Sequence, residues 1–266
     1  MIRTILITGL DGCGKSTLFL KLKSDRPEHA VLVNLPHIDE DALPAGGALK
    51  KQAGLLNQMS SEADENGWAD LKALALFGSM MLYEKLVCEI ITPRTRIVIC
   101  ERHPLIDTLV YAKFYAQRIT PEYFNRKRLD HYNNAYGELL AFIAELLPIE
   151  NKADPVMGIF NFIRNFFKDT TVPDENIKAL FKATLPNKVF FLKADPEILF
   201  ERIASRNVSE PHEKLEVLEL FDNAYDALFE NISQSYRISV EYIDASHFKN
   251  LDRFYARLKN EITNLH

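Results

Sequence analysis

Residues 9–17, G-L-D-G-C-G-K-S-T, match the phosphate-binding loop pattern G-x-x-x-x-G-K-[S/T] at every fixed position. They follow an apolar, β-rich stretch at residues 2–8 and precede a stretch that we interpret as a helix beginning at Lys15. Glycines let the backbone wrap closely round an anion with its N–H groups pointing inward, and the dipole of the following helix adds to the attraction. The strand, the loop and the helix together predict a nucleoside triphosphate site.

Within this loop, each residue type has a separate expected task. Lys15 is expected to reach the β- and γ-phosphates, and the Ser16 hydroxyl is expected to bind Mg²⁺. The expected cofactors are therefore ATP and Mg²⁺. The residues expected to contact the nucleotide are Gly9, Asp11, Gly12, Cys13, Gly14, Lys15, Ser16 and Thr17.

The rest of the chain predicts an α/β fold with a doubly wound parallel sheet. Four further apolar segments, at residues 30–35, 96–101, 188–193 and 239–244, are interpreted as strands. None of them alternates polar and apolar residues, which is typical of strands that helices cover on both faces. Helical stretches separate the segments, as right-handed crossover connections require. Together with the first strand they predict a five-stranded sheet.

Three longer segments lie between these strands. Residues 68–91 predict one long helix that is apolar on all sides and therefore buried. Residues 37–67 contain a proline and a glycine pair and predict a looser, mobile segment over a cleft. Residues from about 120 to 186 predict a helical insertion whose aromatic-rich face suits core packing or a dimer interface. We expect a single domain over residues 1–266 that contains this insertion.

Composition excludes several classes of partner. The chain has 266 residues and a net charge of −5, and it has no basic run with interleaved aromatics, so we expect no nucleic-acid partner. No stretch approaches the roughly 20 apolar residues of a membrane span, so we expect no membrane partner. The three cysteines are scattered, and the chain begins directly with a strand rather than a signal peptide. These features predict a cytoplasmic protein with reduced thiols.

The segment Glu101-Arg102-His103 ends the third expected strand. Ligands bind at the carboxyl ends of strands in open parallel sheets. Glu101 is therefore placed to hold Mg²⁺ through water or to accept a proton from an attacking hydroxyl. Arg102 is placed to neutralise charge on a transferring phosphoryl group. The alternative is an ion pair on the surface at the end of a strand.

A second basic element follows the fourth expected strand. Asp195-Pro196 predicts the start of a helix, with proline at the first helical position. Arg202 and Arg206 are four residues apart, so both lie on one face near the end of this helix. Two guanidinium groups there could fold over a triphosphate as a closing lid does. The alternative is a solvated basic face.

Two short patterns typical of GTPases also occur, D-x-x-G at residues 64–67 and N-K-x-D at residues 151–154. In GTPases each pattern follows a buried apolar strand that presents it at the cleft. Neither pattern follows a credible strand in this chain, and motifs this short recur by chance. We therefore interpret neither as a guanine nucleotide site.

These motifs together resemble the thymidylate kinase and deoxynucleoside kinase branch of the phosphate-loop kinases, over residues 1–118 and 187–264. The loop is similar to the thymidylate kinase form G-x-D-G-x-G-K-S-T, and the resemblance implies that Asp11 faces the sugar or the reacting end of the substrate. Glu101-Arg102-His103 resembles the D-R-Y, D-R-H or E-R-S motifs of this branch. Asp195-Pro196 with Arg202 and Arg206 is similar to its lid region, and residues 242–246, Y-I-D-A-S, resemble its closing strand.

The sequence departs from thymidylate kinases at two positions that concern the acceptor. Those enzymes carry R-E-P-G after the second strand, where this chain has N-L-P-H at residues 34–37. They also carry L-F-A-A-x-R in the next helix, where this chain has Met81 in place of the arginine. Both arginines would grip the monophosphate of the acceptor through charge-assisted hydrogen bonds. Their loss makes a neutral hydroxyl acceptor, such as a nucleoside, more plausible.

We therefore expect a kinase of the nucleotide-kinase type, with the fold of the P-loop nucleoside triphosphate hydrolases, that transfers phosphoryl from ATP to a nucleoside monophosphate. The alternatives are transfer to the 5′-hydroxyl of a nucleoside, and a nucleotide-binding regulator that has lost transfer. The expected partner is a small-molecule nucleotide or nucleoside, and the resemblance is compatible with a homodimer. The expected catalytic residues are Asp11, Lys15, Glu101, Arg102, Arg202 and Arg206, and the expected metal ligands are Ser16 and Glu101.

Overall fold

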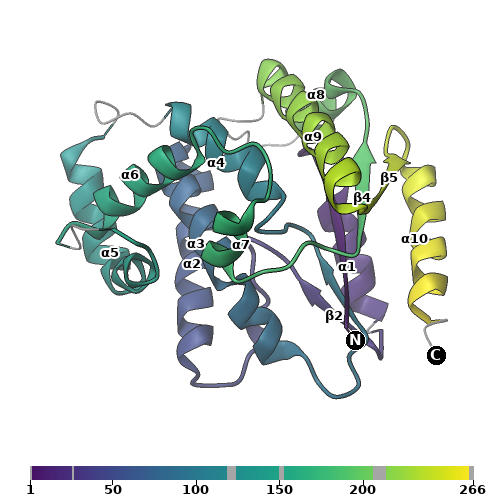
Figure 1. Cartoon of the computed structure of the whole chain (residues 1–266), viewed down its shortest axis with the longest axis horizontal. Coiled ribbons are helices and arrows are strands. Elements are labelled where there is room, and N and C mark those ends of the chain that lie inside the picture. Colours follow the sequence, from purple (N-terminus) through teal and green to yellow (C-terminus); the bar gives the residue numbers. More distant parts are fainter. Residues whose placement is uncertain (1, 26, 119–123, 150–152, 206–213, 264–266) are drawn as a thin grey trace. The chain divides into compact units, whose positions relative to one another are not determined.

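The computed structural model describes residues 2–25, 27–118, 124–149, 153–205 and 214–263. Five strands form one parallel sheet in the order β2-β3-β1-β4-β5 (Figure 1). The predicted α/β fold with a doubly wound, five-stranded parallel sheet and P-loop-like topology is confirmed. The strands are β1 (Arg3–Gly9), β2 (Ala30–Val33), β3 (Ile97–Cys100), β4 (Lys188–Lys193) and β5 (Ser239–Asp244).

The central strands are buried because apolar side chains point to both faces of the sheet. In β1, residues 5–9 are buried, and β3 is buried along its whole length. β1 pairs with β3 through Leu6 and Cys100, and with β4 through Gly9 and Leu192. The parallel register brings the carboxyl end of β1, where the phosphate loop begins, beside the carboxyl ends of β3 and β4.

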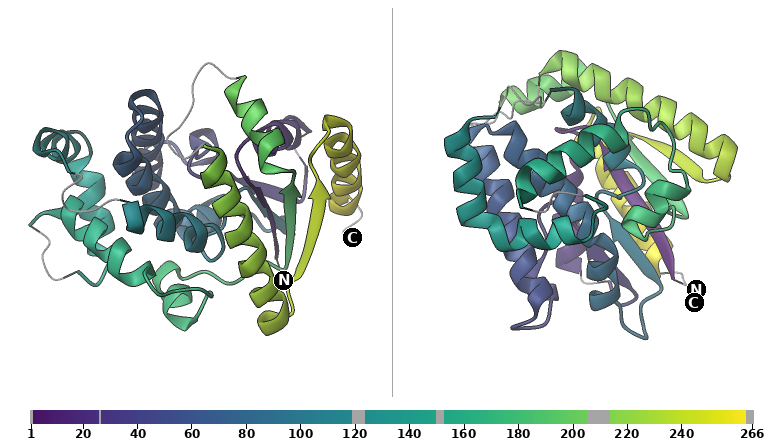
Figure 2. Two further views of the ribbon diagram at one scale, coloured as in Figure 1. Left: turned by 90° about the horizontal axis from the view of Figure 1, so that it is seen from above. Right: turned by 60° about the vertical axis from the view of Figure 1, so that its left-hand side comes forward.

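β5 differs from the expectation that every strand is covered on both faces. It pairs only with β4, and Ser239, Tyr242 and Asp244 are exposed. The physical reason is its place at the edge of the sheet, where α9 (Leu215–Tyr236) and α10 (Phe248–Thr263) contact it. Figure 2 shows α10 lying alongside this strand. The apolar run predicted a strand correctly, but it did not predict how much of the strand is exposed.

The chain divides into two compact units, which we describe separately. Unit 1 comprises Met1–Leu35, Leu86–His103 and Thr184–His266 and contains the whole sheet. Helix α1 (Lys15–Asp25) packs on β1 in this unit, and α8 (Pro196–Ala204) packs on α9. Unit 2 comprises Pro36–Lys85 and Pro104–Ala183.

Unit 2 is helical within the part of the chain that the structure describes. It contains most of α3 (Ala69–Ile90), which confirms the predicted long helix, and residues 70–83 of α3 are all buried. The predicted insertion is also confirmed as helical. Its helices pack against each other and against their neighbours through buried aromatic side chains, including Tyr132, Tyr136, Phe160, Phe167 and Phe181. The other elements of the unit are η1 (Glu40–Ala42), α2 (Ala48–Asn66), α4 (Asp107–Arg118), α5 (Arg126–Glu145), α6 (Pro155–Phe167) and α7 (Glu175–Phe181).

The expectation of a loose segment at residues 37–67 is wrong. Most of it is α2, whose buried positions Ala53, Leu56, Met59 and Ala63 recur every three or four residues. This helical periodicity of small and apolar residues outweighs the local effect of the glycines, of which two precede the helix, Gly54 lies within it and Gly67 is its C-cap. Gly67 ends α2 in the left-handed conformation that favours glycine, with φ of 64°.

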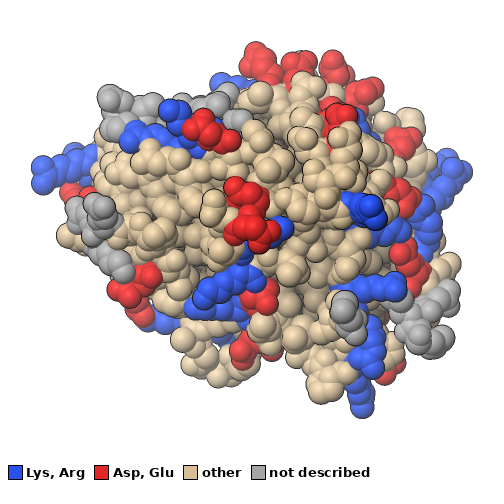
Figure 3. Space-filling view, viewed as in Figure 1, with Lys and Arg blue, Asp and Glu red and all other residues tan. Residues whose placement is uncertain are grey.

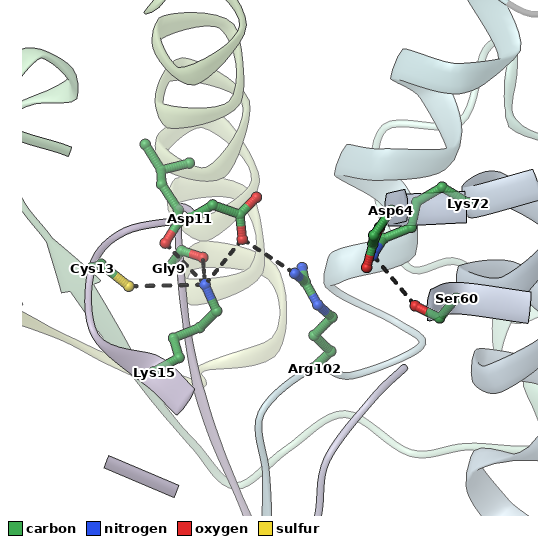
Figure 4. Close-up of polar contacts among 9 residues, drawn as sticks. Gly9, Asp11, Cys13, Lys15, Ser60, Asp64, Lys72 and Arg102 are labelled. Carbon is green, nitrogen blue, oxygen red and sulfur yellow. Dashed lines mark hydrogen bonds and ion pairs between the residues drawn. The ribbon is translucent and has the colours of Figure 1, made fainter. Parts of the chain in front are cut away.

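The D-x-x-G pattern at residues 64–67 is accounted for by this helix end. Asp64 lies in the last turn of α2, and Lys72 Nζ donates a hydrogen bond to its Oδ2 over 2.8 Å (Figure 4). Lys72 Nζ also contacts Ser60 Oγ at 3.3 Å. The carboxylate therefore joins α2 to α3 and does not follow a strand, as a GTPase motif would. The N-K of the second pattern lies outside the described residues, and its aspartate, Asp154, caps the N-terminus of α6.

Candidate functional site

The phosphate loop has a backbone shape that only glycine adopts without strain. Gly9, Gly12 and Gly14 have φ angles of 157°, 82° and 97°. A Cβ on Gly9 would lie 2.5 Å from the carbonyl oxygen of Leu192, and one on Gly14 would lie 2.7 Å from Leu251 Cδ1. The glycines are therefore required both by backbone conformation and by close packing of the loop against β4 and α10.

Lys15 opens α1 and bends back over this loop. Its side chain is buried, and Nζ donates hydrogen bonds to the carbonyl oxygens of Gly9 at 2.8 Å and Leu10 at 2.9 Å (Figure 4). The first backbone hydrogen bond of α1 runs from Leu18 N to Gly14 O. At any helix start the first N–H groups have no acceptor within the helix itself, which makes such a start suited to an anion.

Asp11 and Arg102 meet beside the lysine, although they are 91 residues apart in the sequence. Asp11 Oδ1 lies 3.6 Å from Lys15 Nζ and 3.4 Å from Arg102 Nη2. Arg102 is buried directly after β3, where the backbone N–H of Glu101 donates to Val33 O. The structure thus brings together three of the predicted catalytic residues, Asp11, Lys15 and Arg102, and Glu101 directly precedes Arg102 in the chain.

The charged residues around the loop affect the pKa of the Cys13 thiol. Burial raises the pKa of this thiol, the nearby Lys15 ammonium lowers it, and the carboxylates of Asp11 and Glu101 raise it further. The carboxylate of Glu101 is therefore close enough to the loop to affect the pKa of Cys13. A buried thiol whose pKa is raised is a poor nucleophile, so Cys13 contributes to packing in the loop.

The predicted metal ligands supply the type of donor that Mg²⁺ prefers. Ser16 offers an exposed hydroxyl in the first turn of α1, and Glu101 offers a carboxylate at the carboxyl end of β3. Mg²⁺ usually takes one or two protein oxygens and completes its shell with phosphate oxygens and water. The residues that the structure describes contain no cluster of three or more His, Cys, Asp or Glu suited to a metal.

Arg202 contacts the loop differently from the expected lid. It lies in the last turn of α8, which begins at Pro196 after Asp195 as predicted, and its guanidinium donates to three backbone carbonyls. The acceptors are Gly12 O at 3.4 Å, Ala245 O at 2.9 Å and Ser246 O at 2.6 Å. The guanidinium therefore joins the phosphate loop to the segment after β5. Arg206 lies outside the described residues.

The sequence did not single out Phe248, which lines a hollow beside Arg202. This hollow, in unit 1, is bordered by Ile198, Arg202, Ser246 and Phe248, among others. Phe248 is 61% exposed, and its ring centre lies 5.0 Å from the guanidinium carbon of Arg202. An exposed aromatic residue two positions after I-D-A-S is the sequence signal that could have identified it.

His103 completes the segment after β3 and is buried at zero exposure. Burial lowers the pKa of its imidazole to about 3, although a hydrogen bond with the backbone of Thr184 opposes the shift. The ring is therefore neutral in the folded protein at neutral pH. Thr184 precedes β4, so this hydrogen bond joins the segment after β3, which carries Glu101 and Arg102, to the segment that leads into β4.

The neutral state of His103 predicts a pH dependence of stability. In the unfolded chain the histidine has a pKa of about 6.5, so below this pH it binds a proton that the folded protein does not bind. The contribution of His103 to the free energy of unfolding is therefore complete above pH 6.5 and decreases as the pH falls towards 3. Between pH 6.5 and 5 we expect this residue to lower the free energy of unfolding by about 2 kcal/mol. Urea unfolding of the native protein and of His103→Gln at both pH values measures it, and parallel pH slopes would contradict it.

Unit 2 contains a small cavity of about 20 Å³ that is lined by residues of α3, α4 and α6. Its lining is mostly apolar and aromatic and includes Phe77, Met80 and Tyr115. Thr108 also lines the cavity, and its buried hydroxyl oxygen has no hydrogen-bond partner among the residues that the structure describes. None of the described lining residues is a lysine or an arginine.

Comparisons with models of known protein families and with curated protein sequences find no match to this chain. In the part of the chain that the structure describes, no helix is long and apolar enough to cross a bilayer. On the face shown in Figure 3, acidic and basic side chains are interspersed.

Proposed function

We propose that this protein is an ATP-dependent phosphotransferase that acts on a nucleotide or nucleoside-like acceptor. The observation that carries the proposal is the meeting of Lys15 and Arg102 beside a glycine-rich loop at the start of α1. Two cations and a helix N-terminus beside the carboxyl ends of β1 and β3 are suited to the charges of a triphosphate. Phosphoryl transfer depends mainly on such positioning and charge stabilisation.

In this proposal the residues of unit 1 have distinct roles. The loop amides and Lys15 hold the phosphates, and Arg102 stabilises the group in transfer. Ser16 and Glu101 hold Mg²⁺, which supplies further neutralisation of the phosphate charge. The base of the nucleotide stacks in the hollow beside Phe248 and Arg202, since an exposed ring and a guanidinium offer flat surfaces for it. Arg206 remains a predicted member of the site.

The finer assignment is to the thymidylate kinase and deoxynucleoside kinase branch. It is supported by the loop G-x-D-G-x-G-K-S-T, by Glu101-Arg102-His103 after β3, and by a parallel sheet whose order is compatible with that branch. Within the branch, the acceptor that the sequence first suggests is a nucleoside monophosphate.

A neutral acceptor is favoured by a separate observation in unit 2. The helix that carries the monophosphate-binding arginine in thymidylate kinases has a buried Met81 at the matching position here. A dianionic monophosphate would need charged partners, whereas an uncharged nucleoside would not. Transfer to a nucleoside 5′-hydroxyl is therefore the second candidate function.

ATP consumption measured against a panel of nucleosides and nucleoside monophosphates, with Mg²⁺, tests both candidates. We expect turnover with at least one member of the panel. Turnover with a monophosphate supports the first candidate, and turnover with nucleosides alone supports the second. ATP that binds without turnover on any acceptor would contradict the proposed transfer and would favour a nucleotide-binding regulator.

A further inference from the structure

One oxygen atom of Asp11 lies between the two cations of the loop. In Figure 4 the carboxylate points at both side chains, with Oδ1 at 3.6 Å from Lys15 Nζ and 3.4 Å from Arg102 Nη2. The three side chains are sheltered from water, with exposed fractions of 17% for Asp11, 5% for Lys15 and 9% for Arg102. Ion pairs sheltered in this way are screened less than pairs at the surface.

Carboxylate and phosphate oxygens are equivalent partners for ammonium and guanidinium groups. Both are negatively charged, and both accept short, charge-assisted hydrogen bonds from these donors. A phosphate oxygen that approaches Lys15 or Arg102 must therefore compete with Oδ1 of Asp11, and the two anions repel each other when both are present.

We propose that Asp11 is an internal competitor of the phosphate groups, which holds Lys15 and Arg102 through one carboxylate oxygen and thereby sets the affinity for the triphosphate. The inference rests on the proposed function, because it takes the same two cations as the phosphate-binding groups. Binding is an exchange in which phosphate oxygens replace the carboxylate on both cations. No covalent bond changes in this step.

This role differs from the one that the resemblance implies for Asp11, in which its carboxylate faces the acceptor. A residue that faces the acceptor changes the KM for the acceptor when its charge is removed, and it leaves the binding of a bare polyphosphate unaltered. A competitor changes the Kd of the polyphosphate even when no acceptor and no base are present. The two roles therefore give different results in one binding experiment.

The experiment is calorimetric titration of the whole chain with tripolyphosphate, and separately with ATP. Three proteins are compared, the native one, Asp11→Asn and Asp252→Asn. The last is a matched control, because Asp252 forms an exposed ion pair with Lys21 in unit 1 and its substitution removes the same charge. We expect Asp11→Asn to bind tripolyphosphate about fivefold more tightly than the native protein, at the upper end of the effect of exposed ion pairs, because the carboxylate is sheltered and lies near two cations. The control should bind within twofold of the native protein.

Each other outcome is decisive. Equal or weaker tripolyphosphate binding by a folded Asp11→Asn overturns the inference while leaving the proposed function intact, provided that the native protein binds ATP. Binding by the variant alone supports the inference strongly. If neither protein binds ATP or tripolyphosphate, the proposed function fails and the inference fails with it. Asp11→Ala serves as a second variant, with circular dichroism as the check of folding, and it should show the same tightening.

Discussion

Substitution of Lys15 by alanine is expected to lower phosphoryl transfer by about a thousandfold or more, to the limit of detection. Lys15 is buried, and its Nζ donates hydrogen bonds to the loop carbonyls of Gly9 and Leu10. In the proposed function this ammonium group binds the phosphates and neutralises their charge during transfer. Removal of one preorganised charge partner from a sheltered site typically costs two to three orders of magnitude, and removal of a cation from phosphoryl transfer costs up to about five. Steady-state ATP turnover with the best acceptor measures the loss.

A control variant separates this effect from a general loss of positive charge. Lys21 lies on the same helix, α1, but is half exposed and pairs with Asp252. Lys21→Ala should therefore keep turnover within about twofold of the native value, since an exposed ion pair contributes little. Because Lys15 also satisfies two carbonyls, circular dichroism of Lys15→Ala must show a native spectrum. Unchanged turnover in a folded Lys15→Ala would refute the assignment of a phosphate-transferring site.

Substitution of Gly9 by alanine is expected to be the most destabilising change in the loop. A Cβ would lie 2.5 Å from the backbone oxygen of Leu192 and 2.8 Å from Cys13 Sγ, and the backbone φ of 157° is one that side chains rarely adopt. The Leu192 oxygen belongs to β4 and cannot move without disturbing its pairing with β1. The strain and the overlap together are expected to lower the free energy of unfolding by about 3 kcal/mol.

Gly46 provides the comparison, because it also has a positive φ, 75°, but no atom lies within 4 Å of the position of its Cβ. Gly46→Ala should cost about 1 kcal/mol, the strain of the left-handed conformation alone. Thermal unfolding measures both variants. We expect Gly9→Ala to lower Tm by about 6 to 12 °C, at roughly 2 to 4 °C per kcal/mol for a chain of this size. Equal shifts of Tm in the two variants would show that the overlap of the Gly9→Ala side chain with β4 does not destabilise the protein.

Local patterns in the sequence were sufficient for most of the elements. The five apolar runs predicted the five strands, and the G-x-x-x-x-G-K-[S/T] pattern predicted a loop that opens a helix at Lys15. These predictions succeeded because burial of apolar side chains and the φ angles of glycine are properties of adjacent residues. Local patterns fail at residues 37–67. The glycines and proline there favour a loop, whereas the weaker periodicity of small and apolar residues corresponds to helix α2.

Contacts between residues far apart in sequence were decided by the tertiary structure. The sequence alone determined that a phosphate loop lies between a buried strand and a helix, and that Glu101 and Arg102 end another strand. Only the sheet order, with β1 between β3 and β4, brings Arg102 to Asp11 and Lys15, because parallel neighbours end at the same edge. The tertiary structure also decides the partners of Arg202, which donates to the carbonyls of Gly12, Ala245 and Ser246. The spacing of Arg202 and Arg206 alone predicts a lid over the triphosphate. A pattern fixes which residues share a strand or a helix face, but the partner of a charged side chain depends on which elements the buried core places next to it.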